Sequence, residues 1–379
     1  MNDFTNANAL IGGFKRVKKA SGWKTNTQRF GINLLREVRS LQKDVRGGTY
    51  EQDRGSTFNL CEQGHLRLIK ALSVRDTVMQ HSLCDTVLLP AAQPRLIHDN
   101  GASLKGKGIS FTRKRFEQHL RWHYRQYGLN GYVLKMDFRK YFDNIRHDVL
   151  LDTLRPLIAS YPYAMYAMEK VLMANRIDIS FTDDPDYDKR VFSSLEYEKL
   201  DKSLLTGRRY MEKSVGIGSP VSQIAGIFLP TAIDTYCKTV KGIRCYDAYM
   251  DDRIILHPDK AFLRQLVDEV NEVAANIGVF IHPHKTQIVK LKHGFTFLKT
   301  KYHMTESGRI IRKIPKDVVV RQRRKMKKMY RFLDQEAFAC QYRSWRGDKV
   351  RYNAHKTLCN MDKLYRELIL WQTKRIPSS

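Results

Sequence analysis

Long apolar runs, cysteines and acidic residues are all scarce in this chain, and each scarcity excludes a class of protein. The apolar runs are too short for a membrane span, and the first residues lack the basic-then-apolar order of a signal peptide. The six cysteines contain no Cys-x-x-Cys pair, so neither a zinc ribbon nor a disulfide framework is predicted. We therefore expect a cytoplasmic protein that has no membrane partner.

The shortage of acids leaves a large positive charge. Lys and Arg number 67 against 39 Asp and Glu, which gives a formal net charge of +28 and predicts salt-dependent attraction to nucleic acid. Cations gather in residues 103–108 and 113–115 and alternate with aromatics in 121–127, a mixture typical of surfaces that follow a nucleic acid strand. Residues 321–330 predict a basic helix, with a merely solvated basic face as the alternative.

Two adjacent carboxylates stand out in so basic a chain. Tyr249-Met250-Asp251-Asp252 lies between the apolar runs 243–246 and 254–256, an arrangement that predicts a β-hairpin with an acidic turn. Two neighbouring carboxylates need a partner, and a divalent metal is the usual one for hard oxygen ligands. In isolation, however, Asp-Asp in a turn is more often ordinary solvated turn chemistry.

Further motifs lie around this pair in a recognisable order. Residues 131–137 form an apolar, strand-like run that ends in Asp137, and residues 216–223 open an apolar helical stretch predicted at 224–233. Together with the Tyr-Met-Asp-Asp turn, these segments resemble motifs A, B and C in the palm of a reverse transcriptase. Residues 276–286 resemble motif D, and residues 294–299 resemble the primer-grip hairpin of motif E. The resemblance covers about residues 55 to 305.

The resemblance implies a fold as well as a function. It predicts an α+β right-hand polymerase fold with fingers, a palm made of an antiparallel sheet flanked by helices, and a short helical thumb. The expected parts are an N-terminal helical extension at 1–50, fingers at 51–130, the palm with part of the fingers at 131–305, and the thumb at 306–379. Residues 183–188 are rich in turn-forming residues and predict an exposed insertion loop.

The reaction of this family requires two metal ions, which activate a 3′-hydroxyl and neutralise the pyrophosphate. By resemblance, Asp137 and Asp251 would bridge two Mg²⁺ ions, with Mn²⁺ as a substitute. Asp252 would be a weaker ligand, and the carbonyl of Phe138 would complete the sphere. Lys285 would donate a proton to the departing pyrophosphate, although a surface lysine that faces phosphate is an equal alternative.

Other positions correspond to nucleotide-binding residues of the family. Arg67 and Arg75 follow the pattern of the fingers hairpin and would grip the triphosphate with planar guanidinium groups. Phe142 would form the aromatic floor under the sugar and exclude a 2′-hydroxyl, with plain core packing as its alternative. Gly218 and Gln223 would lie against the templating base pair.

The sequence leaves two biological settings open. The Ile-Gly-x-x-x-Ser-Gln pattern of residues 217–223 resembles enzymes of diversity-generating retroelements, which implies error-prone copying at template adenines. Lys299, however, stands where those enzymes usually have Gly, which leaves an antiphage defence enzyme as the second setting. The expected partners are a structured noncoding RNA template, a DNA or RNA primer, dNTPs, and either a small basic accessory protein or a second reverse transcriptase.

Two other classes of protein compete with this interpretation. An RNA-directed RNA polymerase would share the aspartates. Its hairpin, however, usually reads Gly-Asp-Asp, where this chain has Met250 before the acids, and it has a second acid near the end of motif A, where this chain has Phe142. A non-catalytic RNA-binding protein built on a palm is opposed by the intact Asp137, Asp251 and Asp252.

Overall fold

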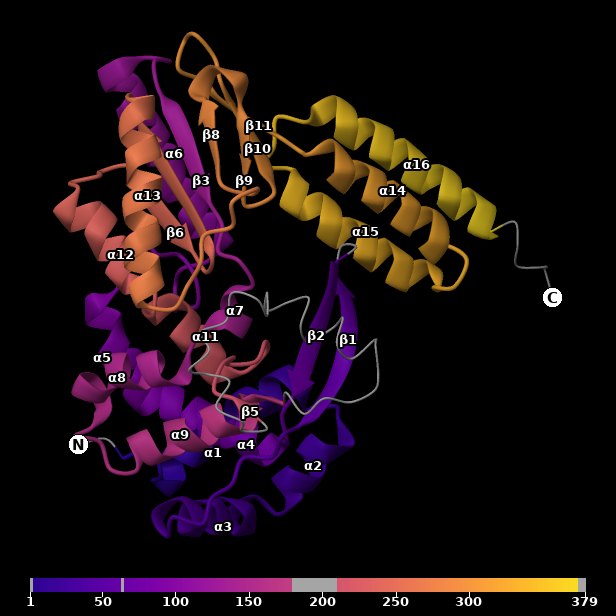
Figure 1. The fold of residues 1–379 in the computed structure, drawn as a ribbon. Helices are drawn as coiled ribbons and strands as arrows, with labels where there is room; N and C mark the ends of the chain where they lie inside the picture. The colour runs from indigo at the N-terminus through magenta and orange to yellow at the C-terminus, as the bar shows by residue number, and fades with distance from the viewer. Residues whose placement is uncertain (1–2, 63–64, 179–209, 374–379) are drawn as a thin grey trace, which may run out of the picture. The chain divides into compact units, whose positions relative to one another are not determined.

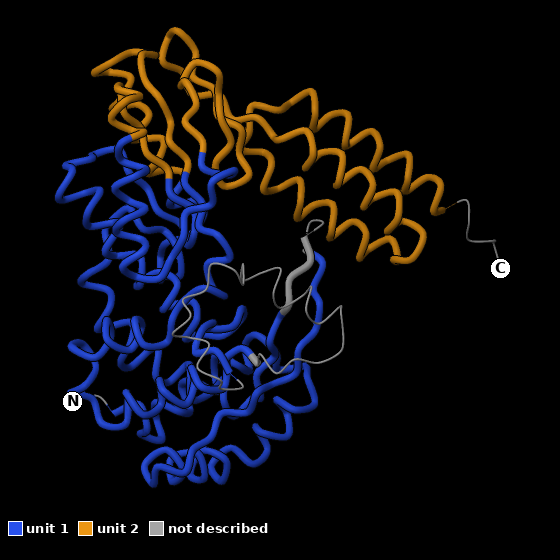
Figure 2. Tube along the Cα trace, in the orientation of Figure 1, with its two compact units in different colours: residues 1–112, 136–253, 265–286 blue, residues 113–135, 254–264, 287–379 orange. Residues whose placement is uncertain are grey.

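The computed structural model describes residues 3–62, 65–178 and 210–373, and of residues 62, 65–68 and 178 it describes the backbone alone. The chain forms two compact units, drawn in blue and orange in Figure 2. Unit 1 comprises residues 1–112, 136–253 and 265–286, and unit 2 comprises the remainder. The predicted insertion loop at 183–188 lies outside the described residues.

Unit 1 begins with three helices, α1 (Ala7–Ser21), α2 (Thr25–Ile32) and α3 (Leu34–Arg46), shown in indigo in Figure 1. The Asn6 side chain caps α1 by accepting a hydrogen bond from the backbone of Asn8. At Gly13, α1 approaches α4 (Val74–Leu83) so closely that a Cβ would lie 2.5 Å from the Val78 carbonyl oxygen. Only glycine allows this contact between the helices.

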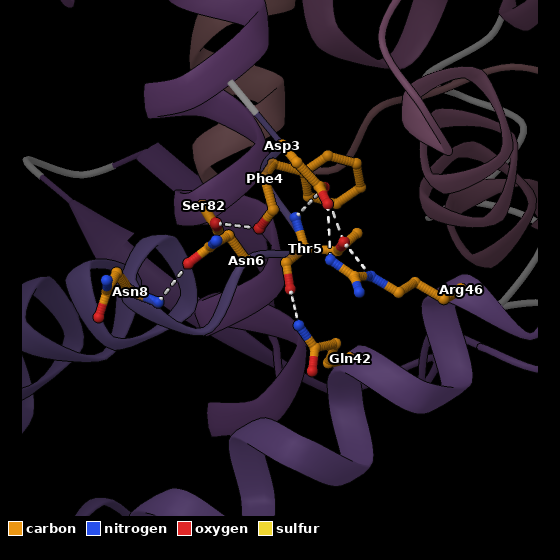
Figure 3. A network of polar contacts seen from close by, with 8 residues as sticks. All are labelled: Asp3, Phe4, Thr5, Asn6, Asn8, Gln42, Arg46 and Ser82. Atoms are coloured by element: carbon orange, nitrogen blue, oxygen red, sulfur yellow. Dashed lines mark hydrogen bonds and ion pairs between the residues drawn. The ribbon is translucent and has the colours of Figure 1, made fainter. Parts of the chain in front are cut away.

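Polar contacts anchor the residues that precede α1 (Figure 3). Arg46 of α3 pairs with Asp3 at 2.7 Å, and Gln42 donates to the Thr5 carbonyl at 2.9 Å. Ser82 of α4 donates to the Phe4 carbonyl at 2.6 Å. These bonds satisfy backbone groups that the folded helices would otherwise leave buried without partners.

The strands β1 (Ser56–Glu62) and β2 (His65–Ala71) form an antiparallel hairpin in the region predicted for the fingers. Its register runs from the Ser56–Ala71 pair to the Glu62–His65 pair. The other elements that unit 1 contributes after α4 are mainly short helices and short strands. They are η1 (Cys84–Leu88), α5 (Leu89–Ala92), η2 (Gln93–Arg95), α7 (Tyr141–Asn144), α8 (His147–Ile158), α9 (Ala164–Asn175), β4 (Ile177–Asp178), β5 (Tyr210–Met211), α11 (Pro220–Phe228), α12 (Thr231–Thr235), η5 (Tyr236–Val240) and β6 (Tyr246–Tyr249).

The prediction of one continuous helical stretch at 224–233 is wrong, because the structure has two helices there. The helix α11 ends at Phe228 and α12 begins at Thr231, with Pro230 between them. Proline lacks a backbone N–H and its ring clashes with the preceding turn, so it separates the two helices. The start of α11 is well defined, because Ser219 caps it and Pro220 occupies its first position.

A four-stranded sheet has the order β6-β7-β3-β8, with β7 at Asp252–His257, β3 at Tyr132–Met136 and β8 at Gln287–Lys290. The predicted strand at 131–137 is therefore confirmed, and it pairs antiparallel with β8. Helix α13 (Lys260–Asn276) connects β7 to the motif D segment. Asp137 follows directly where β3 ends, so the sheet places this carboxylate at a strand terminus.

Unit 2 contains a second antiparallel sheet of order β11-β10-β9, made of β9 (Phe295–Phe297), β10 (Thr300–Met304) and β11 (Ile310–Lys313). Phe116 of α6 (Ile109–Tyr127) packs on this sheet, with ring centroids 5.2 Å from Phe297 and 5.3 Å from Tyr302. The hairpin predicted at motif E is confirmed.

The last three helices of unit 2 lie side by side in Figure 1 and have their own hydrophobic core. They are α14 (Lys316–Met329), α15 (Gln335–Lys349) and α16 (His355–Thr373). The basic helix predicted at 321–330 is confirmed as most of α14. The core of this bundle consists of Met326, Tyr330, Phe338, Tyr342, Met361 and Leu368.

Within the described part of the chain, no helix combines the length and the apolarity that crossing a membrane would require.

Candidate active site

The Tyr-Met-Asp-Asp segment forms the predicted hairpin turn, since β6 ends at Tyr249 and β7 begins at Asp252. Its first strand starts at Tyr246 and not at Ile243, because the Ile243 amide donates to the Cys237 carbonyl at 3.0 Å and not to the sheet. Met250 has a φ of 53°, in the left-handed region that non-glycine residues seldom adopt. The turn is therefore strained and needs support from its surroundings.

The motif D segment lies against Asp137. The amide of His282 donates to the Asp137 carbonyl at 2.7 Å, and the amide of Arg139 donates to the Phe280 carbonyl at 2.7 Å. Lys285 then extends to Asp137, with its ammonium nitrogen 3.0 Å from the carboxylate Oδ2. The Lys285 side chain is 60% exposed and that of Asp137 is 20% exposed, so the pair has one side open to solvent.

Asp251 belongs to the same electrostatic site. Burial raises the pKa of Asp251, and repulsion from Asp137 raises it further, whereas Arg253 and Lys285 act in the opposite direction. Two carboxylates that repel each other in a half-buried place favour a cation between them. Their oxygen atoms suit Mg²⁺, which binds a few carboxylates and keeps its remaining waters.

The described residues contain no group of three or more His, Cys, Asp or Glu side chains arranged to hold a metal ion. Asp137 and Asp251 therefore account for only part of the predicted ligand set. Asp252 begins β7, one residue beyond the turn, and Phe138 lies one residue beyond Asp137. Their roles as additional ligands stay predictions.

An arginine that the sequence analysis missed lies beneath the turn. Arg253 is 2% exposed, and its Nε lies 3.3 Å from Oδ1 of Asp234, which is 1% exposed. Its Nη1 donates to the Met250 carbonyl, and its guanidinium carbon lies 4.9 Å from the centroid of the Phe138 ring. An arginine within an otherwise apolar strand, and an aspartate in the buried stretch before it, are the sequence signals that indicate such a pair.

Phe142 lies on α7 and packs over α11. A Cβ on Gly226 would lie 3.0 Å from Cε1 of the Phe142 ring, so the ring covers this glycine closely. Tyr141 contacts Phe142 edge-on at 5.3 Å and donates to the Gly226 carbonyl at 3.0 Å. The half-buried Phe142 ring is thereby held in place, while its contact with a sugar stays a prediction.

The motif B loop contains two glycines with positive φ, Gly216 at 68° and Gly218 at 109°. A Cβ at Gly216 would lie 2.6 Å from Oδ1 of Asn175, so any other residue would have to displace that side chain as well as adopt a positive φ. The amide of Val221 donates to the Gln80 side chain at 3.3 Å, which ties the start of α11 to α4. Gly218 and Gln223 are both exposed, as residues that contact a base pair must be.

The fingers cations have different surroundings. Arg75 pairs with Asp44 and lies over the Tyr50 ring at 5.5 Å, so its predicted contact with a triphosphate requires this pair to open. Arg67 lies on β2 opposite Leu60, and its side chain is outside the described part of the structure. Lys70 donates to the Ala174 carbonyl, and burial lowers its pKa to about 8, with Arg54 adding to the effect.

Comparison with known families identifies the class of protein. The family model described as reverse transcriptase (RNA-dependent DNA polymerase) matches residues 56–302, well over half of the chain. The chain belongs to this family, whose description is that of RNA-dependent DNA polymerases. The predicted α+β right-hand polymerase fold is thereby confirmed, together with the antiparallel sheets and flanking helices described above.

Among solved structures, the chain is similar to a telomerase from Candida albicans, solved in complex with a TWJ fragment of telomeric RNA. The sequence identity is 15% and the TM-score is 0.45, and the match covers 89% of this chain and 56% of the telomerase chain. The present chain thus spans little more than half the length of that protein. No curated protein matches the sequence.

Proposed function

We propose that this chain copies an RNA template into DNA by two-metal nucleotidyl transfer. The observation that carries the proposal is the meeting of Asp137, Asp251 and Lys285 at the Tyr-Met-Asp-Asp turn. Two opposed carboxylates provide the hard oxygen ligands that Mg²⁺ prefers, and Mn²⁺ would substitute for it. Bound ions would supply charge neutralisation and activation of the primer hydroxyl.

The residues of the chain supply the remaining chemistry. Asp137 and Asp251 would hold the ions, with Asp252 and the Phe138 carbonyl as further ligands. Lys285, with a mostly exposed side chain, donates a proton to the pyrophosphate as it leaves. Because its ammonium group already contacts Asp137, the proton donor and the metal ligand are positioned together before substrate arrives.

Substrate selection is assigned to the residues around this centre. Phe142, held by Tyr141 and Gly226, excludes the 2′-hydroxyl of a ribonucleotide. Arg67 and Arg75 bind the triphosphate, the latter after release from Asp44. Gly218 and Gln223 contact the templating pair.

The proposed template is a structured noncoding RNA in the cytoplasm. DNA synthesis on this template extends a DNA or RNA primer. The net charge of +28 and the basic helix α14 support a phosphate-rich partner. A small basic accessory protein or a second reverse transcriptase is a further proposed partner. The motif B pattern at 217–223 supports a diversity-generating retroelement, and Lys299 supports an antiphage defence system.

Primer extension on defined RNA and DNA templates tests the proposal. We expect dNTP-dependent and RNA-templated synthesis that requires Mg²⁺ and is abolished when Asp251 and Asp252 are both replaced by Ala. The double variant should still bind RNA, because Lys and Arg elsewhere make the phosphate contacts. Asp152→Ala, which removes a 76% exposed carboxylate on α8, is the control and should leave synthesis unchanged.

The alternatives give different results in the same assay. Extension with ribonucleotides would identify an RNA-directed RNA polymerase, and RNA binding without any extension would identify a non-catalytic protein. Sequencing the RNA that copurifies with the chain, together with its cDNA, separates the two settings. Errors concentrated opposite template adenines would favour the retroelement, and accurate copies of one noncoding RNA would favour the defence system.

A further inference from the structure

Arg253 is a buried cation that the proposed reaction does not use directly. It follows the two turn aspartates, and the next three residues of β7, Ile254, Ile255 and Leu256, are buried and apolar. Placing a guanidinium there carries a large desolvation cost unless partners compensate for it. A charge in such a position is therefore expected to have a specific task.

One part of the guanidinium is fixed by a buried acid. Nε lies 3.3 Å from Oδ1 of Asp234, and the same oxygen accepts a hydrogen bond from the Tyr246 hydroxyl. Arg253, Asp234 and Tyr246 are all at most 2% exposed. These contacts fix the orientation of the guanidinium, because little space remains for it to rotate.

The other contacts of the guanidinium are with Met250 and Phe138, which are the sequence neighbours of Asp251 and Asp137. Its Nη1 donates to the carbonyl of Met250, the residue whose φ of 53° shapes the turn immediately before Asp251. Its central carbon lies over the ring of Phe138, 4.9 Å from the ring centroid, and Phe138 immediately follows Asp137. One rigid group therefore touches the neighbours of both Asp137 and Asp251.

From these contacts we infer that Arg253 is a positioning residue, which sets the Asp251 turn against the Asp137 segment and so builds the metal site in advance. The inference rests on the proposed function, because it assigns a role within the same site. Arginine suits the task better than lysine. Its planar fork donates in several fixed directions and stacks on an aromatic ring at the same time.

The test compares three variants by their affinity for Mn²⁺ alone, measured by electron paramagnetic resonance in the absence of nucleic acid. Arg253→Gln combined with Asp234→Asn removes both buried charges and the contacts of the guanidinium, and leaves no isolated charge in the core. Arg253→Lys keeps the positive charge but loses the fork. Arg155→Gln combined with Asp152→Asn makes the same two changes in an exposed pair on α8 and is the matched control.

We expect the double variant to bind Mn²⁺ about tenfold more weakly than the wild type, equivalent to about 1.4 kcal/mol. Arg253→Lys should fall between the two, and the Arg155→Gln, Asp152→Asn control should stay within about twofold of the wild type. The Mg²⁺ concentration for half-maximal DNA synthesis should rise in the same order. All proteins are compared well below their melting temperatures, so that a loss of folding is not mistaken for a loss of positioning.

Wild-type Mn²⁺ affinity in the folded Arg253→Gln, Asp234→Asn variant would overturn the inference, and so would an equal loss of affinity in the Arg155→Gln, Asp152→Asn control. If the double variant does not fold, Arg253→Lys decides the question, and unchanged affinity in that variant would count against the role. A wild type that binds Mn²⁺ but synthesises no DNA would instead refute the proposed function. The two failures can therefore be told apart.

Discussion

The ammonium nitrogen of Lys285 lies 3.0 Å from Oδ2 of Asp137, although the two residues come from segments far apart in the sequence. Backbone hydrogen bonds from residues 139 and 282 hold these segments together. The contact joins the proposed proton donor to a proposed metal ligand, and it makes the role of the lysine testable.

Lys285→Ala should slow the chemical step about 100-fold, the lower end of the range for a general acid. Single-turnover incorporation of one dNTP measures this step apart from product release. Lys292→Ala, which removes an exposed lysine further along the chain, is the control. A loss of less than about twofold in Lys285→Ala would make Lys285 an ordinary surface lysine.

Phe142→Ala should raise the incorporation of ribonucleotides relative to deoxyribonucleotides, because the ring that blocks the 2′-hydroxyl is lost. The ratio of kcat/KM values for a dNTP and its matching ribonucleotide measures the effect, and each tenfold change corresponds to about 1.4 kcal/mol. Tyr141→Phe removes only the hydroxyl that donates to the Gly226 carbonyl, so it should leave the ratio unchanged. If Phe142→Ala also leaves it unchanged, the ring serves only for packing.

The motif B pattern at 217–223 can be tested by changing its two distinctive side chains, Ile217 and Gln223. Proline is unsuitable at 223, because the Gln223 amide donates to the Ser219 carbonyl at 3.3 Å in the first turn of α11. Ile217→Gln with Gln223→Ala keeps that bond while changing the side chains beside the templating pair. Errors opposite template adenines should decrease, as measured by sequencing cDNA from one defined template. An error spectrum identical to that of the wild type, or a wild type that is already accurate, would remove the retroelement setting.

Lys299→Gly should stabilise unit 2. Lys299 is exposed and has a φ of 60° in the turn between β9 and β10, a conformation that costs a non-glycine residue roughly 1–2 kcal/mol. After the greater unfolded-state entropy of glycine is subtracted, we expect a gain of about 0.5–1 kcal/mol, measured by urea unfolding. Lys301→Gly, in the extended strand β10, should destabilise the protein instead. Equal losses in the two variants would contradict the strain assigned to Lys299.

Lys70 should make stability depend on pH above neutrality. Burial lowers its pKa to about 8 in the folded protein, from an ordinary value of 10.5. The protonated amine is thus disfavoured by folding, so its destabilising effect is complete below about pH 8 and fades as the pH rises towards 10.5. The melting temperature of the wild type should therefore rise relative to that of Lys70→Met between pH 8 and 10. Lys313→Met, at an exposed lysine, should follow the wild type, and parallel curves for Lys70→Met would contradict the shift.

The sequence by itself determined the elements whose signals are local. Apolar runs next to turn residues were enough to predict β3 and the hairpin at motif C, because strand and turn preferences act over a few residues. The hairpin at motif E was predicted from the resemblance of residues 294–299 to the family's primer grip. The order of the motifs also predicted the family, since each motif carries its own residue types. The split between α11 and α12 had a local signal too, in Pro230, but the apolar run across it obscured the break.

Only the tertiary structure decided which charges meet. Arg253 is next to Asp252 in the sequence, yet its side chain turns to Asp234, Tyr246 and the Met250 carbonyl. Arg75 resembles a nucleotide ligand, a role that stays a prediction, and the fold of the N-terminal helices also supplies Asp44 as its partner. Partner choice of this kind depends on distance and burial between remote segments, because a charge buried away from water must find its counterpart wherever the chain brings one within reach. The local sequence around each charge therefore does not show which partner it will have.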